Sequence, residues 1–257
     1  MLYQLKRHPF AVTARFQQVL VLTYAFPGRV LERLIPPGLT LDTHQQWAFL
    51  AVALVQTCGL RPVFVPRCLG RSFFLAGYRV FVRHRDRHGQ IRRGLRILRS
   101  DADRASMVFF GNLLTHYNYR QVSASLHATQ QFLEVAVKSP DGAGDLHVIA
   151  DLGSRPAPLP EHSPFADQRH ARRFAGPLPY TFDYEPQTHS IIRIQASRAR
   201  WQPEPIRVEV IQNSFVQSGS LAVTEPILAA AFHVRDIDYR WERGVREPLL
   251  AENRRDI

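Results

Sequence analysis

Apolar positions in the first quarter of the chain follow strand-like patterns on either side of a short helical one. Residues 15–26, RFQQVLVLTYAF, are rich in β-branched and aromatic residues and predict a buried strand. Residues 47–55, WAFLAVALV, are uniformly apolar and predict a strand buried on both faces. Between them, PGRVLERLIPPG at 27–38 has apolar side chains at helical spacing and ends in Pro-Pro-Gly, which predicts a helix of about two turns.

The next segments predict a loop, a hairpin and a second helix. Residues 60–70, LRPVFVPRCLG, contain helix-breaking prolines and end in glycine, which is typical of a loop that covers a pocket. Residues 72–84 and 91–99 alternate like strands around the polar turn RDRHGQ, so Arg79 and Phe81 share one face and Tyr78 and Val80 the other. Either Ser100 or Asp101 is then expected to cap a helix.

The remaining pattern is mostly of strand type. Strands are expected at 119–127, 131–138, 146–152, 180–184, 191–199 and 206–211, a third helix after Ser163-Pro164, and a polar tail at 242–257. About ten strands and three short helices predict one α+β domain spanning 1–257. Its core is expected to be a large, curled, barrel-like antiparallel or mixed sheet.

The composition limits the cellular location and the partners that can be expected. The 257 residues carry a formal net charge of +11, yet among 33 basic residues only Lys6 and Lys138 are lysines. The start shows no signal-peptide core, and the longest apolar run is about half of a membrane span, so a cytosolic protein with no membrane partner is expected. Cys58 and Cys68 are too few for a disulfide framework and are expected to be reduced. The positive charge keeps nucleic acid as an alternative partner.

Standard catalytic motifs are missing. The sequence contains no GxGxxG, GxxxxGK[ST], HExxH or GxSxG pattern, so nucleotide-binding and triad-hydrolase functions lose their main support, and neither a cofactor nor a metal is expected. His84 and His88 are interpreted as solvated residues of the hairpin, and Asp183 and Glu185 as residues of an exposed strand face.

The segment 111–126, GNLLTHYNYRQVSASL, is the best candidate site. At a predicted helix–strand junction it presents five consecutive residues with polar or aromatic side chains, His116, Tyr117, Asn118, Tyr119 and Arg120. Residues at such junctions face pockets while the scaffold fixes them, although ordinary packing at the rim is the competing interpretation.

The same segment carries a family resemblance. TYAFPGRVLERLIPPGLTLD resembles the early strand, helix and turn of acetoacetate decarboxylases, and GNLLTHYNYR resembles their GRELxxYPKK segment, with Gly111 and Tyr117 in matching places. The chain is still more similar to an uncharacterised bacterial family with the acetoacetate decarboxylase-like fold, the domain of unknown function 2071 type. The resemblance covers about residues 14–239.

The resemblance also implies which catalytic groups this chain lacks. The decarboxylase forms a Schiff base from the first lysine of its KK pair, where this sequence has Tyr119 followed by Arg120. Tyrosine forms no imine, and arginine does not give up its proton. Leu75 replaces the expected strand glutamate and Gln17 the expected early arginine, whereas Arg79 matches the family's strand arginine.

Together these observations predict a pocket that binds a small organic acid or keto compound. Arg79, His116, Tyr117 and Asn118 are the expected binding residues, and Tyr119 and Arg120 the expected reactive pair, with Tyr119 as a proton donor. A lyase or isomerase without a Schiff-base lysine, a ligand-sensing protein without turnover and a nucleic-acid-associated protein remain alternatives. The number of subunits is left open, a homo-oligomer included.

Overall fold

Long antiparallel strands dominate the computed structural model, which describes residues 2–154, 156–199 and 201–249. The strands are β1 (Val12–Pro27), β2 (Leu39–Leu41), β3 (Trp47–Pro62), β4 (Arg71–Arg85), β5 (Ile91–Ala102), β6 (Tyr119–Gln121), β7 (Ser123–Ala128), β8 (Phe132–Lys138), β9 (Leu146–Asp151), β10 (Tyr180–Glu185), β11 (Ser190–Arg198), β12 (Glu204–Pro205), β13 (Arg207–Asn213), β14 (Ile227–Trp241) and β15 (Val245–Pro248). The α-helices are α1 (Gly28–Glu32), α2 (Ala105–Leu114) and α3 (Gln168–Ala175), and the 3-10 helices are η1 (Leu2–Arg7), η2 (Arg67–Leu69), η3 (Pro186–Thr188) and η4 (Gly219–Leu221).

The larger sheet curls into a barrel-like ring. Neighbouring strands follow the order β14-β1-β3-β4-β5-β10-β11, and β11 pairs again with β14. Every pairing in this ring is antiparallel except that of β10 with β5. Joining the two ends of the sheet leaves fewer open strand edges and encloses an interior, which is the architectural basis of the site.

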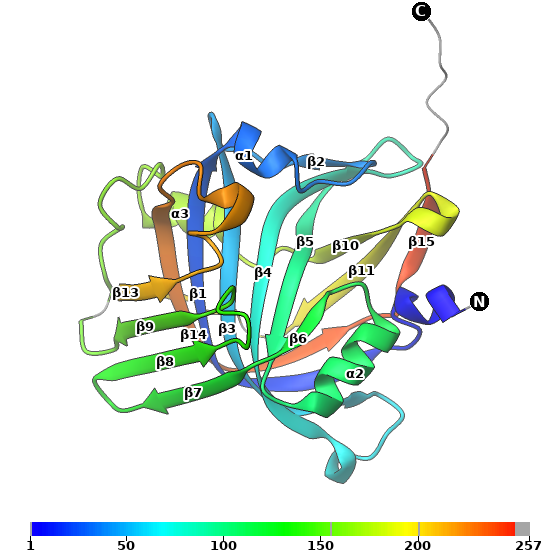
Figure 1. Cartoon of the computed structure of the whole chain (residues 1–257), viewed down its shortest axis with the longest axis horizontal. Coiled ribbons are helices and arrows are strands. Elements are labelled where there is room, and N and C mark those ends of the chain that lie inside the picture. The colour runs from blue at the N-terminus through cyan, green and yellow to red at the C-terminus, as the bar shows by residue number, and fades with distance from the viewer. Residues whose placement is uncertain (1, 155, 200, 250–257) are drawn as a thin grey trace, which may run out of the picture.

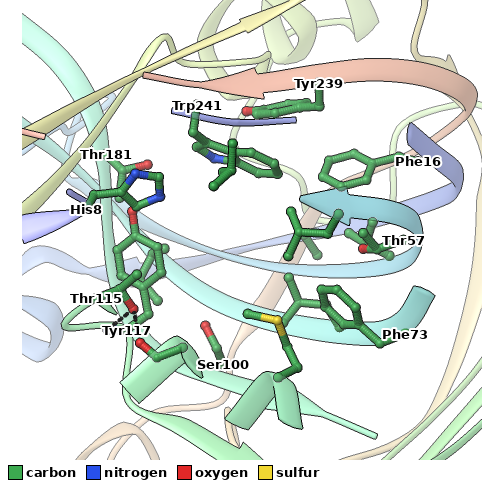
Figure 2. A pocket seen from close by; sticks show the side chains of 18 of the residues that line it. His8, Phe16, Thr57, Phe73, Ser100, Thr115, Tyr117, Thr181, Tyr239 and Trp241 are labelled. Atoms are coloured by element: carbon green, nitrogen blue, oxygen red, sulfur yellow. Dashed lines mark hydrogen bonds between the residues drawn. The ribbon is translucent and has the colours of Figure 1, made fainter. Parts of the chain in front are cut away.

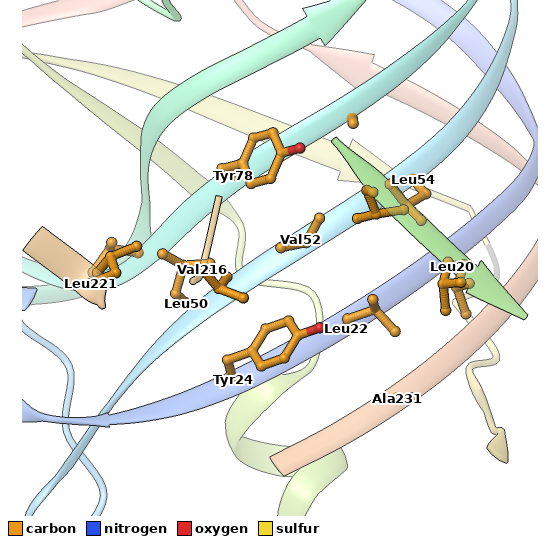
Figure 3. Packing of buried hydrophobic residues seen from close by; sticks show 14 of the residues in the cluster. Leu20, Leu22, Tyr24, Leu50, Val52, Leu54, Tyr78, Val216, Leu221 and Ala231 are labelled. Atoms are coloured by element: carbon orange, nitrogen blue, oxygen red, sulfur yellow. The ribbon is translucent and has the colours of Figure 1, made fainter. Parts of the chain in front are cut away.

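A second sheet, β13-β9-β8-β7, covers one outer side of the ring, in front of β1 and β3 in Figure 1. The main core lies between the two sheets. Figure 3 shows that β1 contributes Leu20 and Leu22 to it, β3 contributes Val52 and Leu54, and β4 contributes Tyr78. Because strand side chains alternate, the residues between these point to the inside of the ring.

In the middle of β3 the inward side chains are smaller than the outward ones. On β3, Ala51 and Ala53 point inward, whereas the outward neighbours are Leu50, Val52 and Leu54. Small inward residues leave the interior incompletely filled, so the apolar run that predicts a doubly buried strand also creates a hollow.

Most predicted elements are present, and the largest differences concern helix starts. Helix α2 begins at Ala105, because Ser100 and Asp101 remain in β5, where they pair with β4 on one side and with Tyr119 and Arg120 of β6 on the other. Helix α3 begins at Gln168, after Asp167, whose side chain accepts a hydrogen bond from the backbone N–H of His170.

The C-terminal region contains more strand structure than the sequence predicts. Strand β14 pairs with β1 over most of its length, and part of the predicted polar tail forms β15 against β11. Residues 250–257 of that predicted tail lie outside the described residues. None of the helices that the structure describes is long and apolar enough to cross a membrane.

Two carboxylates expected at an exposed strand face are buried. Asp183 is 1% exposed and pairs with Arg96, and Glu185 is completely buried and pairs with Arg7 at 2.6 Å. His84 is also buried, bonded to Glu247 at 2.9 Å, instead of solvated in the hairpin. Alternation gives the face of a strand but not what covers that face, which explains these errors.

Candidate functional site

A cavity of about 900 Å³ occupies the interior of the ring. Its apolar wall comes from inward residues of β1, β3, β4, β5 and β14, and its rim from the 60–72 segment and helix α2. Within the predicted loop 60–70, β3 continues to Pro62, and Val65, Leu69 and Gly70 line the cavity. Figure 2 shows His8, Thr181, Tyr117, Thr115 and Ser100 on one side of the cavity, and Phe16, Tyr239, Trp241, Thr57 and Phe73 on the other, which is the more apolar side.

Five arginines line the cavity, and two of them, Arg79 and Arg198, are desolvated by burial and have no carboxylate partner among the described residues. Among its described lining residues none is Asp, Glu or Lys. The buried Nε of Arg79 has no hydrogen-bond partner, and the Arg198 guanidinium donates to the Tyr239 hydroxyl at 3.1 Å and the Leu178 carbonyl at 2.8 Å. Burial lowers the pKa of both arginines, and the charge of Arg79 further lowers that of Arg198. Both guanidiniums remain protonated, so positive charge is concentrated there without compensation.

Gly77 makes room for the Arg79 side chain. The two residues lie on the same face of β4, and a Cβ at position 77 would lie 2.9 Å from both Nε and Nη2 of Arg79. The guanidinium therefore lies along its own strand, over Gly77, instead of projecting straight across the ring.

Tyr117 and Tyr119 form the polar side of the cavity together with Thr181. Tyr117 is 6% exposed, its hydroxyl is buried, and Figure 2 shows it pointing toward His8 and Thr181. Burial raises the pKa of both tyrosines above the usual value of 10, and the opposing effect of Arg79 is smaller. Both phenols are therefore protonated at neutral pH and donate hydrogen bonds.

Gly111 of helix α2 positions the Tyr119 ring. A Cβ on Gly111 would lie 2.3 Å from Cδ2 of that ring, closer than any real contact. Asn112 holds the Tyr119 backbone from the same helix, accepting from its N–H at 2.8 Å and donating to its carbonyl at 2.9 Å. The helix therefore fixes both the backbone and the ring of Tyr119.

We expect Gly111→Ala to lower the free energy of unfolding by about 1–3 kcal/mol, because the added methyl group must displace the Tyr119 ring. Urea denaturation measures this change. Gly28→Ala is the control: its Cβ would meet only the Gln46 carbonyl at 4.0 Å, so stability should be kept or improved. Equal effects of both substitutions would contradict this role of Gly111.

His8 is a cavity residue that the sequence interpretation missed. It follows η1 with a left-handed backbone (φ 56°), donates its N–H to the Leu114 carbonyl at 3.0 Å and accepts at its carbonyl from Gly244 at 2.9 Å. Its ring is buried, and Nδ1 has no hydrogen-bond partner. A lone histidine before the first strand gives no sequence signal, because the strands that meet it are far away in the chain.

Burial lowers the pKa of His8 to about 4 from 6.5. Between these pH values the unfolded chain takes up a proton that the folded protein excludes, so His8 makes stability fall as the pH drops from about 6.5 to about 4. The contribution lost is about 3 kcal/mol. We expect His8→Asn, which tolerates the left-handed backbone, to remove this part of the pH dependence.

Urea denaturation of both proteins at pH 7 and pH 4.5 measures this effect. His116, whose pKa is also lowered to about 4 by burial, is common to both proteins and does not enter the difference between them. A stability difference that is the same at the two pH values would show that His8 does not titrate in this way.

The structure brings together only part of the predicted site. Arg79, Tyr117 and Tyr119 line the cavity, whereas His116, Asn118 and Arg120 are not among its lining residues. Arg120 is 45% exposed and pairs with Asp141 at 3.0 Å, and the Asn118 amide donates to the Leu98 carbonyl at 3.3 Å. Strand alternation on β6 explains the correction: when Tyr119 points inward, Arg120 must point outward.

Neither lysine is among the described cavity residues. Lys138 is 69% exposed and pairs with Asp145 at 2.9 Å, and Lys6 lies in η1. Within the described part of the chain, no group of three or more His, Cys, Asp or Glu side chains could hold a metal ion.

Comparison with solved structures shows an acetoacetate decarboxylase-like fold. Acetoacetate decarboxylase from Legionella pneumophila matches with a TM-score of 0.63 and 11% identity, covering 93% of this chain and 87% of that one. An acetoacetate decarboxylase-like enzyme from Sphingomonas wittichii RW1 gives 0.61 and 11%, covering 93% and 94%. The enduracididine biosynthesis enzyme MppR, complexed with pyruvate, gives 0.59 and 10%, covering 93% and 90%.

At these identities the match shows the fold alone. Within that fold class, the family model of DUF2071, described as an uncharacterized conserved protein, matches residues 13–235. The chain therefore belongs to the DUF2071 family, which confirms the resemblance seen in the sequence. Comparison with curated proteins gives no match.

Proposed function

We propose that this protein binds a small anionic carbonyl compound inside the ring, through Arg79 and Arg198 and through the hydroxyls of Tyr117 and Tyr119. The observation that carries the proposal is the pair of guanidiniums in a cavity whose described lining contains no acid. A desolvated cation without a counter-charge is costly, and neither Arg79 nor Arg198 has a carboxylate partner among the described residues, so the site favours an anion. A carboxylate fits a guanidinium through two parallel charge-assisted hydrogen bonds.

The tyrosines suit a carbonyl group beside that carboxylate. Because burial keeps both phenols protonated, they donate hydrogen bonds to a keto or enolate oxygen instead of removing a proton as phenolates. Their raised pKa values favour binding and polarisation of a carbonyl over general-base catalysis. A keto acid also agrees with MppR, whose structure was solved with pyruvate.

The proposed site works without an imine. The decarboxylase chemistry implied by the fold needs a lysine amine in the cavity, and here Tyr119 and Arg120 occupy the matching positions. Instead of an imine, Arg79 and the two phenols provide electrostatic stabilisation of an oxyanion. Such a site is compatible with a ligand-sensing protein and with a lyase or isomerase that does not form a Schiff base.

Tryptophan fluorescence provides the test, because Trp201 and Trp241 line the cavity whereas Trp47 packs in another cluster. We expect pyruvate or acetoacetate to change the emission saturably and methyl pyruvate, which lacks the charge, to fail. Borohydride added to the pyruvate complex should leave the protein mass unchanged. Equal binding of the ester would contradict the anion site, and a reduced covalent adduct would contradict the imine-free site.

A further inference from the structure

The cavity is far larger than its polar end requires. A volume of about 900 Å³ lies near the top of the range for pockets that enclose drug-sized ligands, and pyruvate would fill a small part of it. The remaining wall is apolar, with Val19 and Val21 from β1, Ala51 and Ala53 from β3, and Phe232 from β14.

The apolar wall is a continuous surface next to the charged groups. Phe16 packs against Tyr239 with ring centroids 4.9 Å apart, and Tyr239 packs against Trp241 at 4.4 Å. The hydroxyl of the same Tyr239 accepts from Arg198, so one residue borders both the cationic end and the aromatic wall. A ligand whose charged head reaches Arg198 would place its body against these rings.

The cavity also extends to an apolar rim. Leu69 of η2 and Phe110 of α2 line it and are 63% and 54% exposed, although both are large apolar side chains. Apolar side chains left at the mouth of a cavity are typical of a site that receives an apolar ligand.

We infer that the ligand is an amphipathic carboxylate, a 2-oxo acid with a medium-length alkyl or aryl tail, whose head binds the two arginines and whose tail lies along the wall formed by β1, β3 and β14. This inference rests on the proposed function and adds the tail to it. Each methylene buried against the wall contributes roughly 0.8 kcal/mol, which corresponds to about a fourfold lower Kd.

Calorimetric titration of the unmodified protein with 2-oxo acids of increasing length, from pyruvate to 2-oxodecanoate, tests the inference. The Kd is expected to fall by about fourfold per methylene until the cavity is full, so that 2-oxooctanoate, which has about five more methylenes, binds roughly 1,000-fold more tightly than pyruvate if all of them are buried. If pyruvate binds and the Kd stays constant or rises with the length of the 2-oxo acid, the inference that the apolar wall binds a tail is wrong, while the proposed function stands. If no member binds, both fail.

Two further measurements test separately the contribution of the charged head and that of the apolar tail to binding. Ala53→Phe places a large ring on the wall and should shrink the ratio of the pyruvate Kd to the 2-oxooctanoate Kd, with Arg120→Met, outside the cavity, as the control that keeps this ratio. 1-Octanol should bind far more weakly than octanoate. Equal binding of the alcohol would overturn the charged head and the proposed function with it, and an unchanged ratio in Ala53→Phe would overturn the location of the tail.

Discussion

Replacing Arg79 by methionine should have opposite effects on binding and on stability. Methionine has a similar length and no charge, so the variant removes a partly buried cation, with a buried Nε, that no described carboxylate neutralises. We expect the free energy of unfolding of the unliganded protein to rise by about 1–3 kcal/mol. Affinity for a keto acid should fall by roughly 100-fold or more, since charge-assisted hydrogen bonds to the carboxylate are lost. Urea denaturation and fluorescence titration measure the two effects.

Arg120→Met is the matched control for this substitution. Arg120 is exposed and pairs only at the surface with Asp141, so its loss should change stability by less than about 1 kcal/mol and leave keto-acid affinity unchanged. If Arg79→Met kept full affinity, or if Arg120→Met lost it, the cavity would not be the binding site.

Asp101→Asn is expected to give the largest loss of stability. Asp101 accepts a hydrogen bond from Nε of Arg99 at 2.6 Å, and both side chains are almost completely buried, 0% and 4% exposed. Gly144, in the turn between β8 and β9, lies over the pair, because a Cβ there would come within 2.2 Å of Arg99. Asparagine has the same shape but no charge, so it leaves the buried guanidinium uncompensated. We expect about 3–5 kcal/mol of destabilisation in urea denaturation.

The control for Asp101 is an ion pair of the same kind at the surface. Asp236 pairs with Arg15 at 2.9 Å, but both side chains are more than half exposed, so Asp236→Asn should cost less than about 1 kcal/mol. Similar losses for the two substitutions would mean that burial does not set the cost of breaking the Arg99 pair.

Arg99 and Arg79 show why a buried arginine has to be interpreted from its surroundings. Both belong to neighbouring strands of the ring, yet Arg99 has its own carboxylate and Arg79 has none among the described residues. The Arg99–Asp101 ion pair stabilises the fold, and we propose that Arg79 binds the ligand. The local sequence distinguishes them only through Asp101, two residues after Arg99 in β5, whereas no acidic residue lies within four residues of Arg79.

Local sequence patterns were sufficient to predict most strands and the strand face that carries part of the site. The hairpin of β4 and β5, the doubly buried β3 and the loop that lines the cavity follow from alternation, apolar runs and prolines, which depend on neighbouring residues only. Alternation also placed Arg79 and Phe81 on one face, and both line the cavity.

The sequence by itself determined the strand-rich α+β class, the family and the absence of a lysine from the segment that would form an imine. Only the tertiary structure decided that Arg198, His8, Tyr239 and Trp241 meet Tyr117 and Tyr119 around one hollow. The reason is that ring closure joins β14 to both β1 and β11, strands far apart in the chain, and no local pattern encodes which distant strands become neighbours or which face they enclose.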